Sequence, residues 1–189
     1  MRSEEAVSLI KSRGKTVLTF FGYSGMGYED EQGMLDVAHK VLSGYAPEKT
    51  LVNIGVTEVG IGAIYSLAKS MGFETAGIVT TLALEFPEDI SRFADHICFI
   101  KDDQWGGYLP NSEELSPTSR AMVDSSDILV AIGGNEVSRD ELLEGRKQGK
   151  PIHFHPADGN HEMEIRRAKR RGLPEPTSFL GAVHEVFGK

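Results

Sequence analysis

The chain has 189 residues, which fits one domain that buries roughly 70% of its unfolded surface without a disulfide or a structural metal. Hydrophobic residues make up 40% and charged residues 25%, which excludes a disordered chain, a collagen-like fibre and a disulfide scaffold. Because 20 Lys and Arg stand against 28 Asp and Glu, the net charge of −8 argues against broad binding to nucleic acid or to an anionic membrane.

The one cysteine, Cys98, lies between Ile97 and Phe99 in an apolar run. A single cysteine favours a reducing compartment, and its apolar neighbours predict a buried structural thiol. The first ten residues are too acidic, and their apolar run too short, for a secretory signal. The longest aliphatic run, 128–132, is far shorter than the about 20 residues that span a membrane, so we expect a cytoplasmic protein.

Apolar runs bounded by turn residues predict six strands, at 17–21, 51–55, 75–81, 96–100, 127–132 and 151–155. Helical periodicity predicts helices at 34–42, 63–71, near 87–93, from Ser116-Pro117 onward, at 138–147, and at the surface from about 162 to 171 and 177 to 187. Continuously apolar strands that alternate with helices predict an α/β fold: a three-layer, doubly wound, mostly parallel sheet in a single domain spanning 1–189.

Three glycine clusters follow predicted strands, and ligands of doubly wound sheets bind at the carboxyl ends of the strands. We therefore expect Gly22, Gly55 and Gly133 to share one edge of the sheet. The first cluster, 22–27, lacks the dinucleotide fingerprint, the Walker A pattern and the nucleophile elbow. Free N–H groups and a positive φ at Gly25 predict an anion cradle there, with a plain glycine-rich turn as the alternative. Its candidate ligand-binding residues are Gly22, Ser24, Gly25 and Gly27.

The second and third clusters span 56–62 and 132–141. The second either approaches the ligand or serves helix–strand packing. In the third, backbone donors can meet a phosphate or a sugar, and the acidic residues behind them can reach an anomeric carbon. Ser138 and Glu141 also have the spacing of a capping box, which would make Glu141 structural. The candidate ligand-binding residues of these clusters are Thr57, Gly60, Gly62, Gly133, Gly134 and Asn135.

Two further features carry weaker predictions. Trp105, between Gln104 and two glycines, can stack on a base or a sugar, or can serve as a hydrophobic latch. His153 and His155 share one face of a strand, but ordinary strand packing is the favoured interpretation, so we expect neither a metal nor a cofactor. The acidic residues and the histidine that follow this strand, Asp158, His161 and Glu162, are the neighbours that a metal site would need.

The glycine clusters resemble those of the LOG family, cytokinin-activating phosphoribohydrolases within the wider SLOG group of Rossmann-like nucleotide-binding domains. Residues 20–28 are similar to the family's opening strand and G-S-S-x-G loop, 59–68 to its G-L-M-G-A segment, and 126–134 to the strand before its signature. The resemblance covers about 17 to 155. It implies a nucleotide-like ligand, a homodimer, and a role for Arg120 in holding a phosphate or orienting the attacked carbon, with an exposed surface arginine as the alternative.

The family signature, P-G-G-x-G-T-x-x-E, is altered here. Ile132 replaces the proline, Glu136 and Val137 replace the Gly-Thr of the phosphate-binding turn, and Asp140 falls at the catalytic glutamate. The change favours binding of a nucleotide or nucleotide-derived small molecule, as a sensor, carrier or regulator. The alternative is a phosphoribohydrolase that cleaves the N-glycosidic bond of a nucleoside 5′-monophosphate. Its candidate catalytic residues are Arg120, Glu136, Asp140 and Glu141.

Overall fold

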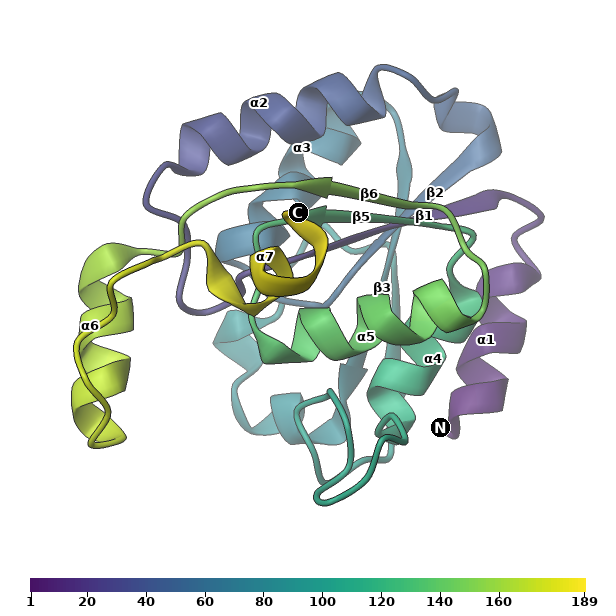
Figure 1. The fold of residues 1–189 in the computed structure, drawn as a ribbon. Coiled ribbons are helices and arrows are strands. Elements are labelled where there is room, and N and C mark those ends of the chain that lie inside the picture. Colours follow the sequence, from purple (N-terminus) through teal and green to yellow (C-terminus); the bar gives the residue numbers. More distant parts are fainter.

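The computed structural model describes all 189 residues, and its centre is a six-stranded sheet in the order β4-β3-β2-β1-β5-β6 (Figure 1). Every neighbouring pair of strands is parallel. The predicted α/β fold with a doubly wound sheet is therefore confirmed. The strands are β1 (Thr16–Gly22), β2 (Thr50–Ile54), β3 (Glu74–Thr80), β4 (His96–Ile100), β5 (Ile128–Ile132) and β6 (Ile152–His155).

Helices cover both faces of the sheet, as the three-layer prediction requires. Their bounds are α1 (Ser3–Lys11), α2 (Glu31–Leu42), α3 (Ile64–Ser70), α4 (Pro117–Ser125), α5 (Glu136–Lys147), α6 (His161–Arg170) and α7 (Gly181–Phe187). The apolar residues of α2 and α3 pack on one face, and those of α1, α4, α5 and α7 on the other. Helix α6 projects from the side of the molecule, and Ala168 is its only buried residue (Figure 1). No helix combines the length and apolar composition needed to cross a bilayer.

The structure differs from the predicted elements in three places. Helix α1 was not predicted, although Ala6 and Ile10 bury its apolar face in the core. The helix expected near 87–93 is wrong: only Pro87–Asp89 form a 3₁₀ turn, because Ile90 is extended and pairs with Thr57. The last helix begins four residues later than expected, since the Phe179 carbonyl, which lies before it, accepts a hydrogen bond from Gly159 N at 2.8 Å.

The order of the strands reverses at β1. The chain runs outward from β1 through β2 and β3 to β4, and then crosses to the other side of β1 to form β5 and β6. Gly22 ends β1, while Gly55 and Gly133 directly follow β2 and β5. Since all the strands are parallel, the three glycines share the carboxyl edge, as predicted. This edge contains the point of reversal at which doubly wound sheets bind their ligands.

Gly60 lies where the loop after β2 closely approaches the loop after β1. Gly60 has a φ of +63°, and a side chain there would collide with the carbonyl oxygens of Tyr23 and Ser24. Gly14 has a similar φ of +66° but open space around it. We expect Gly14→Ala to lower the free energy of unfolding by about 1 kcal/mol, and Gly60→Ala by about 3 kcal/mol or more. Denaturant unfolding followed by circular dichroism measures both; equal losses would contradict the close approach.

Candidate functional site

A cavity of about 660 Å³ opens at the carboxyl edge, on the side of β1 that faces β2 and β3. Its walls come from the ends of β1 and β3, the loop after β2, the loop that carries Trp105, the first turns of α4 and α5, and one residue of α6. Its size falls within the range of about 300–1,000 Å³ that is typical of small-molecule sites. Segments far apart in the sequence therefore meet around one enclosed volume.

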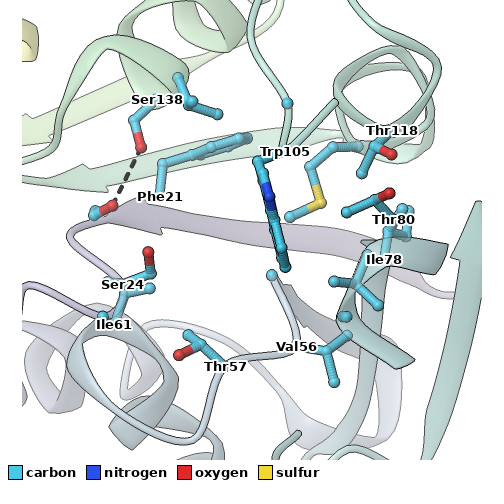
Figure 2. Close-up of a pocket in the computed structure, with 18 of the residues that line it drawn as sticks. Phe21, Ser24, Val56, Thr57, Ile61, Ile78, Thr80, Trp105, Thr118 and Ser138 are labelled. Carbon is cyan, nitrogen blue, oxygen red and sulfur yellow. Dashed lines mark hydrogen bonds between the residues drawn. The ribbon is translucent and has the colours of Figure 1, made fainter. Parts of the chain in front are cut away.

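Two aromatic rings cover the cavity. Trp105 is 59% exposed and Phe86 44% exposed, and their ring centroids lie 6.2 Å apart. In Figure 2 the Trp105 ring reaches into the cavity between Phe21 on one side and Thr80 and Ile78 on the other. Large apolar side chains so exposed at a cavity mouth are typical of a ligand contact, because a planar ligand can stack on them.

The floor is a buried polar cluster. Gly107 N donates to Ser119 Oγ at 2.7 Å, and Ser119 Oγ donates to Glu141 Oε1 at 2.6 Å. Thr118 lines the cavity beside Ser119, and its buried Oγ1 has no hydrogen-bond partner in the chain. Buried hydroxyl groups are rarely left unpaired in native proteins. Because the Thr118 oxygen has no accessible surface, it is an unpaired group behind the wall of the cavity.

The predicted capping box is wrong. Helix α5 begins at Glu136 with Asn135 as its N-cap, so Ser138 lies inside the helix, where its Oγ donates to the Gly22 carbonyl at 3.2 Å (Figure 2). Glu141 consequently lies more than a turn into the helix and faces α4 instead of the helix start. This arrangement frees its carboxyl group for the cavity.

Burial raises the pKa of the Glu141 carboxyl to about 8; the hydrogen bond from Ser119 opposes this shift and the charge of Asp140 adds to it. Glu141 is therefore mostly protonated at neutral pH. Glu136 behaves differently: burial, the largest single effect, raises its pKa, but the hydrogen bond from Arg167 at 2.9 Å, a backbone hydrogen bond and the charges of Arg167 and Arg171 together lower the pKa overall. The cavity thus contains one neutral acid and one paired carboxylate.

Eight of the predicted site residues line the cavity, and seven do not. Those that line it are Gly22, Ser24, Gly25, Thr57, Trp105, Asn135, Glu136 and Glu141. Those outside it are Gly27, Gly60, Gly62, Arg120, Gly133, Gly134 and Asp140.

Close packing explains the glycines outside the cavity except Gly27, which has a φ of +74° and open space around it. A side chain at Gly62 would collide with the Thr57 carbonyl, one at Gly133 with the Tyr23 ring, and one at Gly134 with Val183. For the second cluster, the packing alternative therefore accounts for both Gly60 and Gly62. Gly25 departs from expectation in another way: it lines the cavity and has open space around it, but its φ is not positive.

The two residues at the family's catalytic positions lie away from the cavity. Arg120 is exposed on α4. Asp140 accepts hydrogen bonds from Tyr108 N at 3.1 Å and from Arg139 at 2.9 and 3.1 Å. Asp140 therefore holds the loop that carries Trp105, and the neighbouring Glu141 is the carboxyl group that enters the site.

The cavity also contains residues that the sequence did not reveal. Arg167 is its one basic side chain, and it comes from α6, outside the segment of family resemblance. Thr118 and Ser119 line the cavity and directly precede Arg120 on α4. The sequence prediction therefore named the correct turn of this helix but a side chain that does not reach the cavity. Only the position of α4 against α5 distinguishes these neighbours.

The histidines do not form a metal site, because no group of three or more His, Cys, Asp or Glu side chains is arranged to hold an ion. His153 is exposed. Burial of His155 lowers the pKa of its imidazole, and the charge of the nearby His153 lowers it further. His161 hydrogen bonds to Asp158 at 2.7 Å, and Glu162 pairs with Arg166.

Comparison with known proteins establishes the fold. No family model matches the sequence, and no curated protein is similar to it. The crystal structure of TM1055 is similar, with a TM-score of 0.52 and 18% identity over 72% of each chain. Two structures of the molybdenum cofactor carrier protein from Chlamydomonas reinhardtii have TM-scores of 0.54 and 0.53 at 18% and 19% identity; they cover 84% and 91% of this chain and 86% and 95% of theirs. The chain thus has the same Rossmann-like α/β fold as these structures.

The protonation of Glu141 gives a prediction about stability. Its folded pKa of about 8 lies above the ordinary value of 4.5, so its stabilising contribution is complete below pH 4.5 and is lost as the pH rises to 8. Glu141→Gln can still accept the Ser119 hydrogen bond but cannot ionise. We therefore compare the difference in melting temperature, variant minus wild type, at two pH values. We expect this difference to be a few degrees larger at pH 8 than at pH 5. Scanning calorimetry at both pH values measures this; a pH-independent difference would contradict it.

Proposed function

We propose that this chain binds a nucleotide or a nucleotide-derived small molecule in the cavity at the carboxyl edge of its sheet, as a carrier, sensor or regulator. The observation that carries the proposal is the cavity of about 660 Å³ at the carboxyl edge, on the β2 and β3 side of the point where the strand order reverses, covered by Phe86 and Trp105. Such a site suits a planar ring system, which the aromatic pair can stack upon while apolar side chains surround it.

The charged part of such a ligand would lie at the mouth. The loop of Ser24 and Gly25 and the first turn of α5 line the cavity, and their backbone N–H groups favour an anion. Arg167 adds a guanidinium group that is already paired with Glu136. A phosphate at the mouth would compete with Glu136 for Arg167, so we expect phosphate to contribute modestly to affinity.

Binding is favoured over hydrolysis. Cleavage of an N-glycosidic bond needs a carboxylate near the anomeric carbon and a group that holds the substrate. Asp140 and Arg120 occupy the family's positions for these roles but do not line the cavity, while Glu141 lines it in a mostly protonated form and the carboxylate of Glu136 is paired with Arg167. The Chlamydomonas proteins of similar fold are named as carriers, and we propose a binding role of that kind here.

Replacement of Trp105 tests the aromatic cover. We expect Trp105→Ala to weaken nucleotide binding about tenfold, because an aromatic stacking contact contributes on the order of 1–3 kcal/mol. Titration calorimetry with AMP, GMP, IMP and CMP measures the affinity, and mass spectrometry of molecules retained through native purification extends the search. Leu84→Ala is the matched control, since Leu84 is 55% exposed near Phe86 but does not line the cavity. Equal affinity in wild type and Trp105→Ala would remove Trp105 from the site.

The preference for binding over hydrolysis has its own test. We expect little or no release of base from AMP, GMP, IMP or CMP in an assay of free base by chromatography. Robust release that is lost in Glu136→Gln, Asp140→Asn or Glu141→Gln would overturn the binding role, and the variant that loses release would identify the catalytic carboxylate.

A further inference from the structure

The hydrogen bonds at the floor of the cavity define which of its atoms donate and which accept. The hydroxyl of Ser119 has one proton, which it donates to Glu141 Oε1, while its oxygen accepts from Gly107 N. Glu141 Oε1 is therefore an acceptor within this chain of hydrogen bonds. No other group of the chain bonds to Glu141, so Oε2 is the atom left for a ligand.

The charges around Glu141 favour the neutral acid. On its own helix the neighbouring charge is Asp140, which repels a second negative charge. Helix α4 places no charged side chain in the cavity, and the carboxylate of Asp102, before that helix, accepts from Thr118 N at 2.8 Å. Arg167, the one basic side chain of the cavity, is paired with Glu136. With Oε1 accepting from Ser119, the proton of the acid lies on Oε2, which makes Oε2 a donor.

Thr118 and Thr80 do not add a second polar group to the floor. Only 8% of the Thr118 surface is exposed, and its Oγ1 has no accessible surface, so this oxygen lies behind the cavity wall. Thr80 lies on the same side of Trp105 as Thr118 (Figure 2) and is already engaged, since its Oγ1 donates to the Asp102 carbonyl at 2.8 Å. The floor therefore offers one uncommitted polar atom, Glu141 Oε2, between apolar walls that include Ile78 and Met122.

Resting on the proposed function, we propose that Glu141 donates a hydrogen bond to the polar edge of a neutral heterocycle, and that this floor selects oxo-purines over amino-purines. An oxo-purine presents two neighbouring acceptors, N7 and O6. Adenine presents the same N7 but a donor, its N6 amino group, in place of O6. A donor facing the Glu141 hydroxyl leaves both groups unpaired in a buried site, which is costly.

A fluorescence titration tests the proposal directly, because Trp105 is the only tryptophan of the chain and covers the cavity. The probes are IMP and AMP, each titrated at pH 6.5 and pH 8.5. For the wild type at pH 6.5 we expect IMP to bind about tenfold more tightly than AMP, the factor that one well-placed hydrogen bond provides. At pH 8.5, where Glu141 has largely lost its proton, the affinity for IMP falls severalfold.

Glu141→Gln is the matched variant. Its amide oxygen can accept from Ser119 while its amide nitrogen donates into the cavity at every pH, so the preference for IMP over AMP persists. The affinity of this variant for IMP then changes with pH only because IMP itself titrates. Glu141→Ala loses the preference. Titration of IMP itself affects wild type and Glu141→Gln alike, so the comparison between them isolates the carboxyl group.

The outcomes separate the two proposals. Binding of IMP and AMP with equal affinity, or the same decline with pH in wild type and Glu141→Gln, overturns the role of the floor and leaves the binding function standing. If neither IMP nor AMP, and no other nucleotide of the panel, binds by calorimetry, the proposed function fails and the inference about its floor fails with it.

Discussion

The carboxyl edge of this sheet depends on one close contact, in which the hydroxyl of Tyr28 lies across the ends of β1 and β5. It donates to the Ile132 carbonyl at 2.7 Å and accepts from Tyr23 N at 3.2 Å. Only glycine is possible at position 22, because a side chain there would collide with this hydroxyl. Burial raises the pKa of Tyr28 above its ordinary value, so the phenol remains neutral and acts as both donor and acceptor. The point of strand reversal is thereby closed by a side chain of the protein itself.

Tyr23 extends the same arrangement toward the end of the chain. Its ring packs edge-on against Tyr28, with ring centroids 5.0 Å apart, and its hydroxyl lies within hydrogen-bonding distance of the carbonyls of Ala157 and Phe179, at 3.0 and 3.2 Å. Glycines at positions 133 and 181 leave room for this ring. Much of the glycine at the edge therefore serves two tyrosines, and the open cavity lies on the β2 and β3 side, where Trp105 and Glu141 meet.

The sequence was sufficient for the architecture and for the edge at which the site lies. Continuously apolar strands such as β5 can only be buried, and parallel strands bring their carboxyl ends together, so Gly22, Gly55 and Gly133 could be placed without coordinates. The direction of individual side chains could not be. Asp140 and Glu141 are adjacent, and one residue turns a helix by about 100°, so the position of the helix start decides which carboxyl enters the cavity. That start depends on tertiary packing.

Glycine clusters carried the same ambiguity. A positive φ or a missing side chain is required equally by a phosphate and by a neighbouring tyrosine ring, and only the position of Tyr23 distinguishes them for Gly133. Arg167 was invisible for a different reason: it belongs to a helix whose sequence is strongly polar and matches no motif. Its contribution arises from the way α6 lies beside the first turn of α5, which no local pattern encodes.

Helix α6 connects the cavity to the surface of the protein, because it contributes a side chain to the cavity while it is itself largely exposed. Since Ala168 is its only buried residue, the helix has little apolar contact with the core, and its local opening requires much less free energy than global unfolding. It nevertheless supplies Arg167 to the cavity. A ligand that contacts Arg167 binds only the closed form of α6, and so lowers the population in which the helix is detached. Such a ligand would thus make α6 more ordered, and the surface of this helix would differ between the loaded and the empty protein.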